Sequence, residues 1–311
     1  GLIISHELNN SEHSAQLDAL RQKLNNDWVH TLENSNLSSH FAMQLLNSIS
    51  LLSYPISQGQ KKIIERWSHH TEADIRLEAV KVMCNCSAWE SREPLLDIFT
   101  QVGETPIIRS ATLELLSRQS RYQDDPSSRK TLVDVTRDYL ASENAWLVGG
   151  AILSAKNMQL IELGEDILSH FNHSHPDVRG RACEVAAKLK VKDVEVALIY
   201  TLREDAESMV RYKAAESLLD FCQDHRVQDA LMYAINDEDT SVAISCVQTL
   251  SKAAQSRTIK TLQNVLQGQD VALKLATARS LETFQHPDWI DWIDSHHQQE
   301  ENKMVRTALL E

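Results

Sequence analysis

The chain has 311 residues, with 44 acidic and 31 basic side chains, a formal net charge of −13, and only 8 glycines and 6 prolines. So few helix breakers and aromatic residues favour long helices joined by short turns over sheets. The acidic balance, without a long basic stripe, disfavours binding to nucleic acids and to anionic membranes, because both attract clusters of Lys and Arg.

Residues 1–55 lack the pattern that organises the rest of the chain. Two helices are predicted there, over residues 11–32 and 37–52. We expect this segment to cap the apolar end of a helical stack, because solenoids need a polar-faced end for solubility. A degenerate repeat and a separate partner-binding segment are the alternatives. Residues 1–5 are apolar but too short to span a membrane, and no signal peptide is recognisable.

One pattern recurs over residues 56–311. An aliphatic residue, which we call the anchor, returns about every 32 residues. A cation follows most anchors directly, and a small residue stands four places after nearly all of them, where it lets two helices approach closely. The anchors are Ile75, Ile108, Leu147, Val178, Val210, Val242, Leu273 and Val305. A fixed period of this length indicates a repeat architecture.

A second amphipathic run lies between successive anchors, with apolar residues mainly three and four places apart. These runs cover residues 61–67, 94–99, 132–140, 160–168, 194–202, 227–235, 259–266 and 289–293. Each unit is therefore predicted to be a hairpin of two antiparallel helices, and residues 56–311 an all-α solenoid of seven to eight hairpins. We expect the recurrent arginine to pair with an acidic turn residue of an adjacent unit, which would form a ladder between repeats.

Two stretches depart from the pattern. The longest interval between anchors contains the polar run of residues 117–129, which we interpret as a surface loop, with a partner-contact loop as the alternative. The helix at residues 147–155 has Val148, Gly149 and Gly150 in place of the usual cation and polar residues. Paired glycines weaken a helix unless something packs on them, so they indicate a close helix approach, a kink or the floor of a groove.

The sequences PDVRGRACEVAAKL (residues 176–189) and SMVRYKAAESLLDF (residues 208–221) state the pattern most clearly. These units resemble HEAT repeats, and most of all the bacterial phycobilisome-lyase-type HEAT-like repeat, from about Gln60 to the C-terminus. The resemblance implies a right-handed superhelix whose anchor helices line the concave side. It does not specify a function, because HEAT solenoids bind macromolecules in unrelated pathways.

The last anchor helix starts near Met304 and the sequence stops one or two turns later. Leu309 and Leu310 would make a poor polar cap for a solenoid. We therefore predict that the last repeat is truncated and that the chain is a fragment of a longer protein.

Few residues are candidates for chemistry. Most of the five cysteines lie in anchor helices and are interpreted as small buried side chains of a reduced, cytoplasmic protein. Cys84 and Cys86 would point away from each other on a helix. Histidines gather at residues 170–175 and 296–297, but without the spacing of a four-ligand zinc site.

The HEAT-repeat hydroxylases that act on deoxyhypusine hold two irons with His-Glu pairs on repeated helices. Here the one such pair, His6 and Glu7, lies outside the repeats. We therefore predict no catalytic residue, no metal and no cofactor.

The predicted function is a non-enzymatic scaffold or adaptor that binds a protein or peptide on the concave face. Its contacts would be the third and sixth residues after each anchor, together with one aromatic at the second place. These residues are Glu78, Lys81, Glu114, Arg181, Glu184, Tyr212, Lys213, Glu216, Gln248 and Arg279. Their alternating signs suit a partner of mixed charge. The alternatives are a bilin lyase or isomerase subunit, which the resemblance suggests, and the soluble part of a membrane-anchored complex component.

Overall fold

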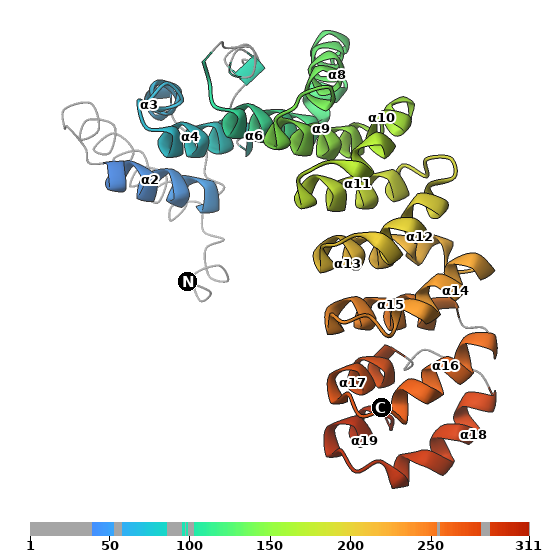
Figure 1. Ribbon diagram of the computed structural model, residues 1–311. Helices are drawn as coiled ribbons and strands as arrows, with labels where there is room; N and C mark the ends of the chain where they lie inside the picture. The colour runs from blue at the N-terminus through green and yellow to red at the C-terminus, as the bar shows by residue number, and fades with distance from the viewer. Residues whose placement is uncertain are drawn as a thin grey trace. The chain divides into compact units, whose positions relative to one another are not determined.

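The computed structural model describes residues 39–52, 58–85, 95–96, 98, 103–253, 256–280 and 287–310. Every element in these ranges is an α-helix or a short 3₁₀ helix, so the all-α prediction is confirmed (Figure 1). The chain divides into two compact units, Gly1–Leu132 and Val133–Glu311. Among the described helices, none combines the length and the hydropathy that a bilayer crossing requires.

The first unit contains α2 (Ser39–Leu52), α3 (Gln58–Trp67), α4 (Ala73–Asn85), α6 (Pro106–Ser117) and α7 (Ser120–Gln123). Helix α4 is central to it, because α2, α3 and α6 all pack on α4. The described part of the predicted N-terminal cap, α2, therefore stacks directly on the first anchor helix. The helix predicted over residues 11–32 lies outside the described residues.

The prediction of a surface loop over residues 117–129 is wrong. This segment contains α7, and α8 (Pro126–Leu140) begins within it. Tyr122 is completely buried, and the Gln119 side chain donates a hydrogen bond to the backbone carbonyl of Cys84. Much of the segment is accessible to solvent, but the buried Tyr122 ring and the bond from Gln119 attach it to the fold.

The second unit is a two-layer stack that takes in the rest of α8. Its anchor helices are α9 (Ala145–Met158), α11 (Pro176–Lys188), α13 (Ser208–Ser217), α15 (Thr240–Ala253), α17 (Val271–Ser280) and α19 (Lys303–Ala308). Its second helices are α10 (Gly164–Ser169), α12 (Val194–Glu204), α14 (His225–Ala234), α16 (Ser256–Leu266) and α18 (Pro287–His296). Four 3₁₀ turns complete it: η1 (Ile161–Leu163), η2 (His170–Asn172), η3 (Leu218–Phe221) and η4 (His297–Gln299). Each anchor helix packs on the next, and the second helices form the other layer (Figure 1).

The repeated positions form the core. Every anchor is buried except Leu273, which is half-buried. The residues four places after the anchors are all buried: Ala79, Thr112, Ala151, Ala182, Ala214, Cys246, Thr277 and Leu309. The small residues among them let neighbouring anchor helices approach closely, so that each anchor side chain is buried between helices. Burial of one Val, Leu or Ile side chain stabilises the fold by about 1.5–3 kcal/mol.

The second helices bury the stripe that their spacing predicts. On α12, Val194, Leu198 and Leu202 are buried, whereas Val196 and Tyr200 on the opposite side are exposed. Polar side chains cap the helices where the turns end. The side-chain oxygen Oδ1 of Asn144 accepts hydrogen bonds from the backbone N–H groups of Trp146 and Leu147, in the first turn of α9. Such caps satisfy backbone donors that have no partner within the helix.

The paired glycines of α9 mark a close approach and not a kink, since α9 is one helix from Ala145 to Met158. The guanidinium of Arg181 on α11 lies across Gly149, with Nη1 only 3.1 Å from the place that a Cβ would occupy. Glycine at this position leaves room for the arginine of the next repeat.

Candidate functional site

The arginine that follows the anchor is a clamp between repeats. Nε and Nη2 of Arg211 donate to the two carboxylate oxygens of Asp237, both at 2.8 Å, and Asp237 lies in the turn before the next anchor helix. Nη1 donates to the backbone carbonyls of Asp205 and Ala206, in the turn before its own helix. The pair is well removed from solvent, with the two side chains 8% and 10% exposed. The predicted ladder is therefore present.

The same geometry recurs in both units. Arg179 forms a bidentate pair with Asp205 at 2.7 and 2.8 Å, and Arg76 in the first unit does so with Glu104 at 2.9 Å. Lys274 reaches Glu300 at 2.6 Å. Burial by itself raises the pKa of Asp205, but hydrogen bonds from Arg179 and from the backbone of Glu207 lower that pKa below its usual value.

Two joints of the second unit lack the clamp, and at each of them both members are absent. Val148 stands where α9 would carry its arginine, and His173 stands where the next turn would carry its carboxylate. At the second such joint, between α15 and α17, Ala243 stands in place of the arginine and Gly268 in place of the carboxylate. His173 keeps the local role of the carboxylate, because its Nδ1 accepts the backbone N–H two residues later, as Asp205 does.

The clamping arginines are therefore largely buried in ion pairs and unavailable to a ligand, which would instead contact the third and sixth residues after each anchor. The candidate residues on the second unit form one face across four helices. Glu184 and Arg181 lie on α11, Tyr212, Lys213 and Glu216 on α13, Gln248 on α15, and Arg279 on α17. All are half-buried or exposed. This set of residues is called the anchor-helix face below.

Two adjoining hollows open on the anchor-helix face. The α11–α13 hollow has a volume of about 320 Å³ and is lined by Glu184, Ala187, Lys188, Lys213, Glu216, Ser217, Leu219 and Asp220. The α13–α17 hollow has a volume of about 390 Å³ and is lined by Tyr212, Glu216, Leu219, Ser245, Gln248, Thr249, Ser251, Lys252, Arg279 and Ser280. Six of the predicted contact residues thus meet around two hollows that share Glu216 and Leu219.

Charges in the α11–α13 hollow are paired across and along the helices. Lys213 binds Glu216 at 2.9 Å, and Lys188 lies 3.7 Å from Asp220. Glu184 accepts a hydrogen bond from Lys156 on α9 at 2.8 Å, and this bond lowers the pKa of Glu184 despite partial burial. The hollow therefore offers three carboxylates and two ammonium groups at fixed places.

The sequence prediction missed three charged residues of these hollows. Lys188, Asp220 and Lys252 all stand ten places after an anchor. The third, sixth and tenth places lie on one stripe of a helix, so extending the predicted stripe by one turn would have found them. Asp220 also follows the end of α13, in the 3₁₀ turn η3.

In the first unit the candidate residues do not gather around a described hollow. Glu78 pairs with Lys81 at 2.5 Å on α4. Glu114 on α6 pairs with Arg118, which is again ten places after an anchor. Such pairs within one helix are typical of a solvated surface and contribute only a few tenths of a kcal/mol, on the order of 0.2–0.5.

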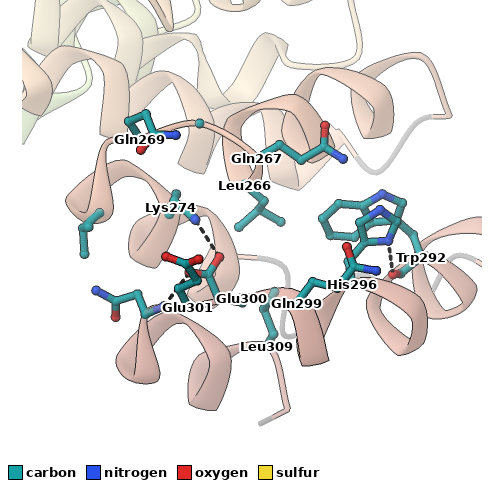
Figure 2. A pocket seen from close by; sticks show the side chains of 13 residues that line it. Leu266, Gln267, Gln269, Lys274, Trp292, His296, Gln299, Glu300, Glu301 and Leu309 are labelled. Atoms are coloured by element: carbon teal, nitrogen blue, oxygen red, sulfur yellow. Dashed lines mark hydrogen bonds and ion pairs between the residues drawn. The ribbon is translucent and has the colours of Figure 1, made fainter.

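A larger hollow lies near the last described residues, with a volume of about 670 Å³ (Figure 2). Lys274 and Glu300 pair on one side of it, and the rings of Trp292 and His296 stack at 4.2 Å on the other. Side-chain amides of the turns, including Gln267 and Gln299, line part of the remaining wall. Lys274 and Leu309 stand at repeated positions, but the turn residues and the ring pair on α18 do not, so the period gave no signal for the hollow as a whole.

The histidine clusters do not form a metal site within the described ranges, where no group of three or more His, Cys, Asp or Glu side chains converges. His296 and His297 direct Nδ1 to backbone carbonyls of their own helix. Burial and the neighbouring His173 lower the pKa of His170. Burial also raises the pKa of the Cys183 and Cys246 thiols to about 12, which makes both unreactive. Cys86 lies outside the described residues.

Comparison with known proteins identifies the repeat. Residues 164–251, from α10 to α15, match the family model described as HEAT repeats. This segment is therefore similar to HEAT repeats. No curated protein matches the chain in sequence. The predicted likeness to the phycobilisome-lyase type stays a prediction.

Solved structures extend the HEAT-like fold beyond that segment. YibA of Escherichia coli matches with a TM-score of 0.60 and 14% identity, over 89% of this chain and 97% of that chain. An engineered protein matches with a TM-score of 0.52 and 13% identity, over 92% of this chain and 87% of that chain. Human deoxyhypusine hydroxylase matches at 14% identity over 86% and 98% of the two chains, but its TM-score of 0.37 is too low to support an argument.

Proposed function

We propose that this chain is a non-enzymatic scaffold that binds a protein or peptide partner across the anchor-helix face of its second unit. The observation that carries the proposal is the pair of adjoining hollows, which joins six regularly spaced side chains from four consecutive anchor helices. A surface built from the same positions of successive repeats suits an extended partner, because each repeat adds one further contact along a line.

The difference in exposure between two groups of charged residues supports this proposal. The cations directly after the anchors are clamped in the ladder, as the 8% exposure of Arg211 illustrates. The charged residues of the face are instead accessible, with Glu216 51% and Lys213 33% exposed. Mixed charges at fixed spacing favour one partner over others more than they add affinity.

The non-enzymatic part of the proposal is supported by the state of the potential nucleophiles. Cys183 and Cys246 are buried, and their raised pKa keeps them protonated at neutral pH. The HEAT-repeat architecture itself is compatible with both binding proteins and enzymes, so the argument rests on the face and not on the fold.

A charge-reversal experiment tests the proposal. The variant Arg181→Glu, Lys213→Glu, Glu216→Lys changes the anchor-helix face and keeps the Lys213 and Glu216 positions oppositely charged. A matched control, Lys192→Glu, Arg203→Glu, Glu204→Lys, makes the same change of net charge at exposed residues of α12 and the turn before it. Circular dichroism would verify that both variants are folded.

Each protein would be used to capture partners from an extract of the source cells, followed by mass spectrometry. We expect a partner that the wild type and the control variant retain and the face variant loses. A partner that binds all three proteins equally would place the binding surface elsewhere and contradict the proposal.

A further inference from the structure

The α13–α17 hollow differs from its neighbour in having cations without a counter-charge. Lys252 on α15 and Arg279 on α17 both line it, and both are exposed. Neither forms an ion pair with any other described side chain, whereas Lys156, Lys188 and Lys213 nearby all pair with carboxylates.

The one carboxylate that lines the α13–α17 hollow is already engaged. Glu216 accepts a hydrogen bond from Lys213 at 2.9 Å, and that bond is the largest contribution to the raised pKa of Lys213. The hollow is therefore positive in a protein whose net charge is −13. Within the part of the chain that the structure describes, neither cation has a carboxylate partner, and two such cations from different helices that line one hollow favour an anion there.

The walls of the hollow indicate an anion attached to a chain. Tyr212 and Leu219 provide apolar surface beside the cations, and the small residues Ser245 and Thr249 line the same space. An aliphatic stem ending in a carboxylate fits this combination, because the stem can lie on the apolar wall while the cations bind the oxygens.

We propose that the α13–α17 hollow receives an Asp or Glu side chain of an extended segment of the partner protein, bound through Lys252 and Arg279. This inference rests on the proposed function. A nucleic acid is disfavoured as the occupant, because its phosphates would continue into the α11–α13 hollow and meet Glu184, Glu216 and Asp220.

The neighbouring hollow sets the register of the segment. Packed helices lie about 10 Å apart, and an extended chain advances about 3.3 Å per residue. Lys252 and Arg279 lie on α15 and α17, which places them two helix spacings, or about 16–20 Å, from the hollow between α11 and α13. The residue over the α11–α13 hollow is therefore about five to six positions from the acidic residue. The three carboxylates of that hollow are already paired with Lys156, Lys188 and Lys213, so the acidic residue is the charged feature by which the segment is recognised.

A peptide-display selection tests this inference. Random peptides of about twelve residues, long enough to cross several repeats when extended, would be selected on the immobilised full chain. The same library would be selected on Lys252→Glu, Arg279→Glu and on a control, Lys192→Glu, Arg203→Glu, which makes the same charge change on exposed residues.

We expect peptides selected on the wild type to share an Asp or Glu at one position. Their affinity should fall by about tenfold or more on the Lys252 and Arg279 variant, and not on the control. Peptides selected on that variant should instead carry Lys or Arg at the same position.

Two negative results have different meanings. Peptides that lose binding to the Arg181, Lys213 and Glu216 variant but bind the Lys252 and Arg279 variant unchanged would overturn this inference and leave the proposed function standing. Peptides indifferent to both sets of substitutions, or a library that yields no binder, would overturn the proposed function and this inference with it.

Discussion

The substitution Arg211→Met tests the ladder most directly. Methionine keeps much of the apolar stem but removes the two bonds to the Asp237 carboxylate and the two bonds to the backbone carbonyls of Asp205 and Ala206. It also removes a longer bond, 3.3 Å, to the carboxylate of Glu238, which is exposed and contributes little. Asp237 would remain about nine-tenths buried, with the backbone N–H of Asp239 as its remaining donor of those described. A buried charge that loses its partner is strongly destabilising.

We expect the free energy of unfolding to fall by about 3 kcal/mol. Breaking one side of a buried ion pair costs about 3–5 kcal/mol, and the partial exposure of this pair, together with the remaining hydrogen bond, places it at the lower end. Urea unfolding followed by circular dichroism would measure the loss as a lower midpoint at an unchanged slope.

The control is Arg226→Met on α14. Arg226 also contacts two carboxylates, those of Asp224 and Glu195, but its side chain is 62% exposed. Exposed ion pairs contribute little, so its unfolding midpoint should coincide with that of the wild type.

The double variant Arg211→Met, Asp237→Asn completes a thermodynamic cycle. Its two changes should be non-additive by about 2 kcal/mol, because removing the second partner relieves the unpaired charge. Equal small losses in the Arg211 and Arg226 variants, or additive losses in the cycle, would refute the reasoning that the ladder clamps the repeats.

Three further predictions follow from described contacts. The pKa of Asp205 is lowered in the folded chain, so this carboxylate stabilises the fold above the pKa of the unfolded chain, about 4, and the stabilisation is lost as the pH falls through the lower pKa of the folded chain. Asp205→Asn should therefore flatten the decline in urea midpoints measured between about pH 6 and about pH 3. Gly149→Ala should raise the free energy of unfolding by up to about 1 kcal/mol, because alanine favours a helix over glycine and the new Cβ meets only the flexible end of the Arg181 side chain. Gly164→Ala should lower the free energy of unfolding, because its Cβ would lie 2.8 Å from a methyl group of buried Val191; the opposite order in urea unfolding would contradict the packing. Cys183 and Cys246 should resist alkylation by iodoacetamide at neutral pH until urea unfolds the chain, as measured by peptide mass spectrometry. Rapid alkylation of either cysteine in the folded protein would contradict its burial.

The period of the sequence predicts the core correctly because it records helix packing. An anchor such as Val210 and the alanine four places later must both be buried if helices stack every 32 residues or so, and both are. The ladder was predictable for a similar reason, since a cation that recurs with the period has its counterpart in the neighbouring unit. That Asp237 would be the bidentate partner, with Glu238 as a longer contact of Arg211 at 3.3 Å, was not predictable, because Asp237, Glu238 and Asp239 are all acidic and adjacent.

The irregular parts escaped prediction because their structure depends on single side chains. The buried Tyr122 attaches the polar run of residues 117–129 to the fold, and the period of the sequence gives no signal for this residue. On the candidate face, the third and sixth places after each anchor lie on one stripe of the helix, and the prediction left out the tenth place of the same stripe. Lys252, the residue that makes one hollow basic, therefore became visible only once α15 was seen to continue to Ala253.

The uneven ladder also has a mechanical consequence. Asp205 serves two arginines, with its carboxylate bound to Arg179 and its carbonyl to Arg211, so the repeats anchored at Val178, Val210 and Val242 are clamped in series. The joints on either side, at Val148 and at Ala243, are held without this bond, and bending strain concentrates where a stack is least tightly joined.

The second of these unclamped joints lies between α15 and α17, the helices that carry Lys252 and Arg279. If bending of the stack concentrates at this joint, it would change the separation of those two cations more than that of charges within the clamped block. We therefore expect the α13–α17 hollow to adjust its width to an occupant more readily than the α11–α13 hollow.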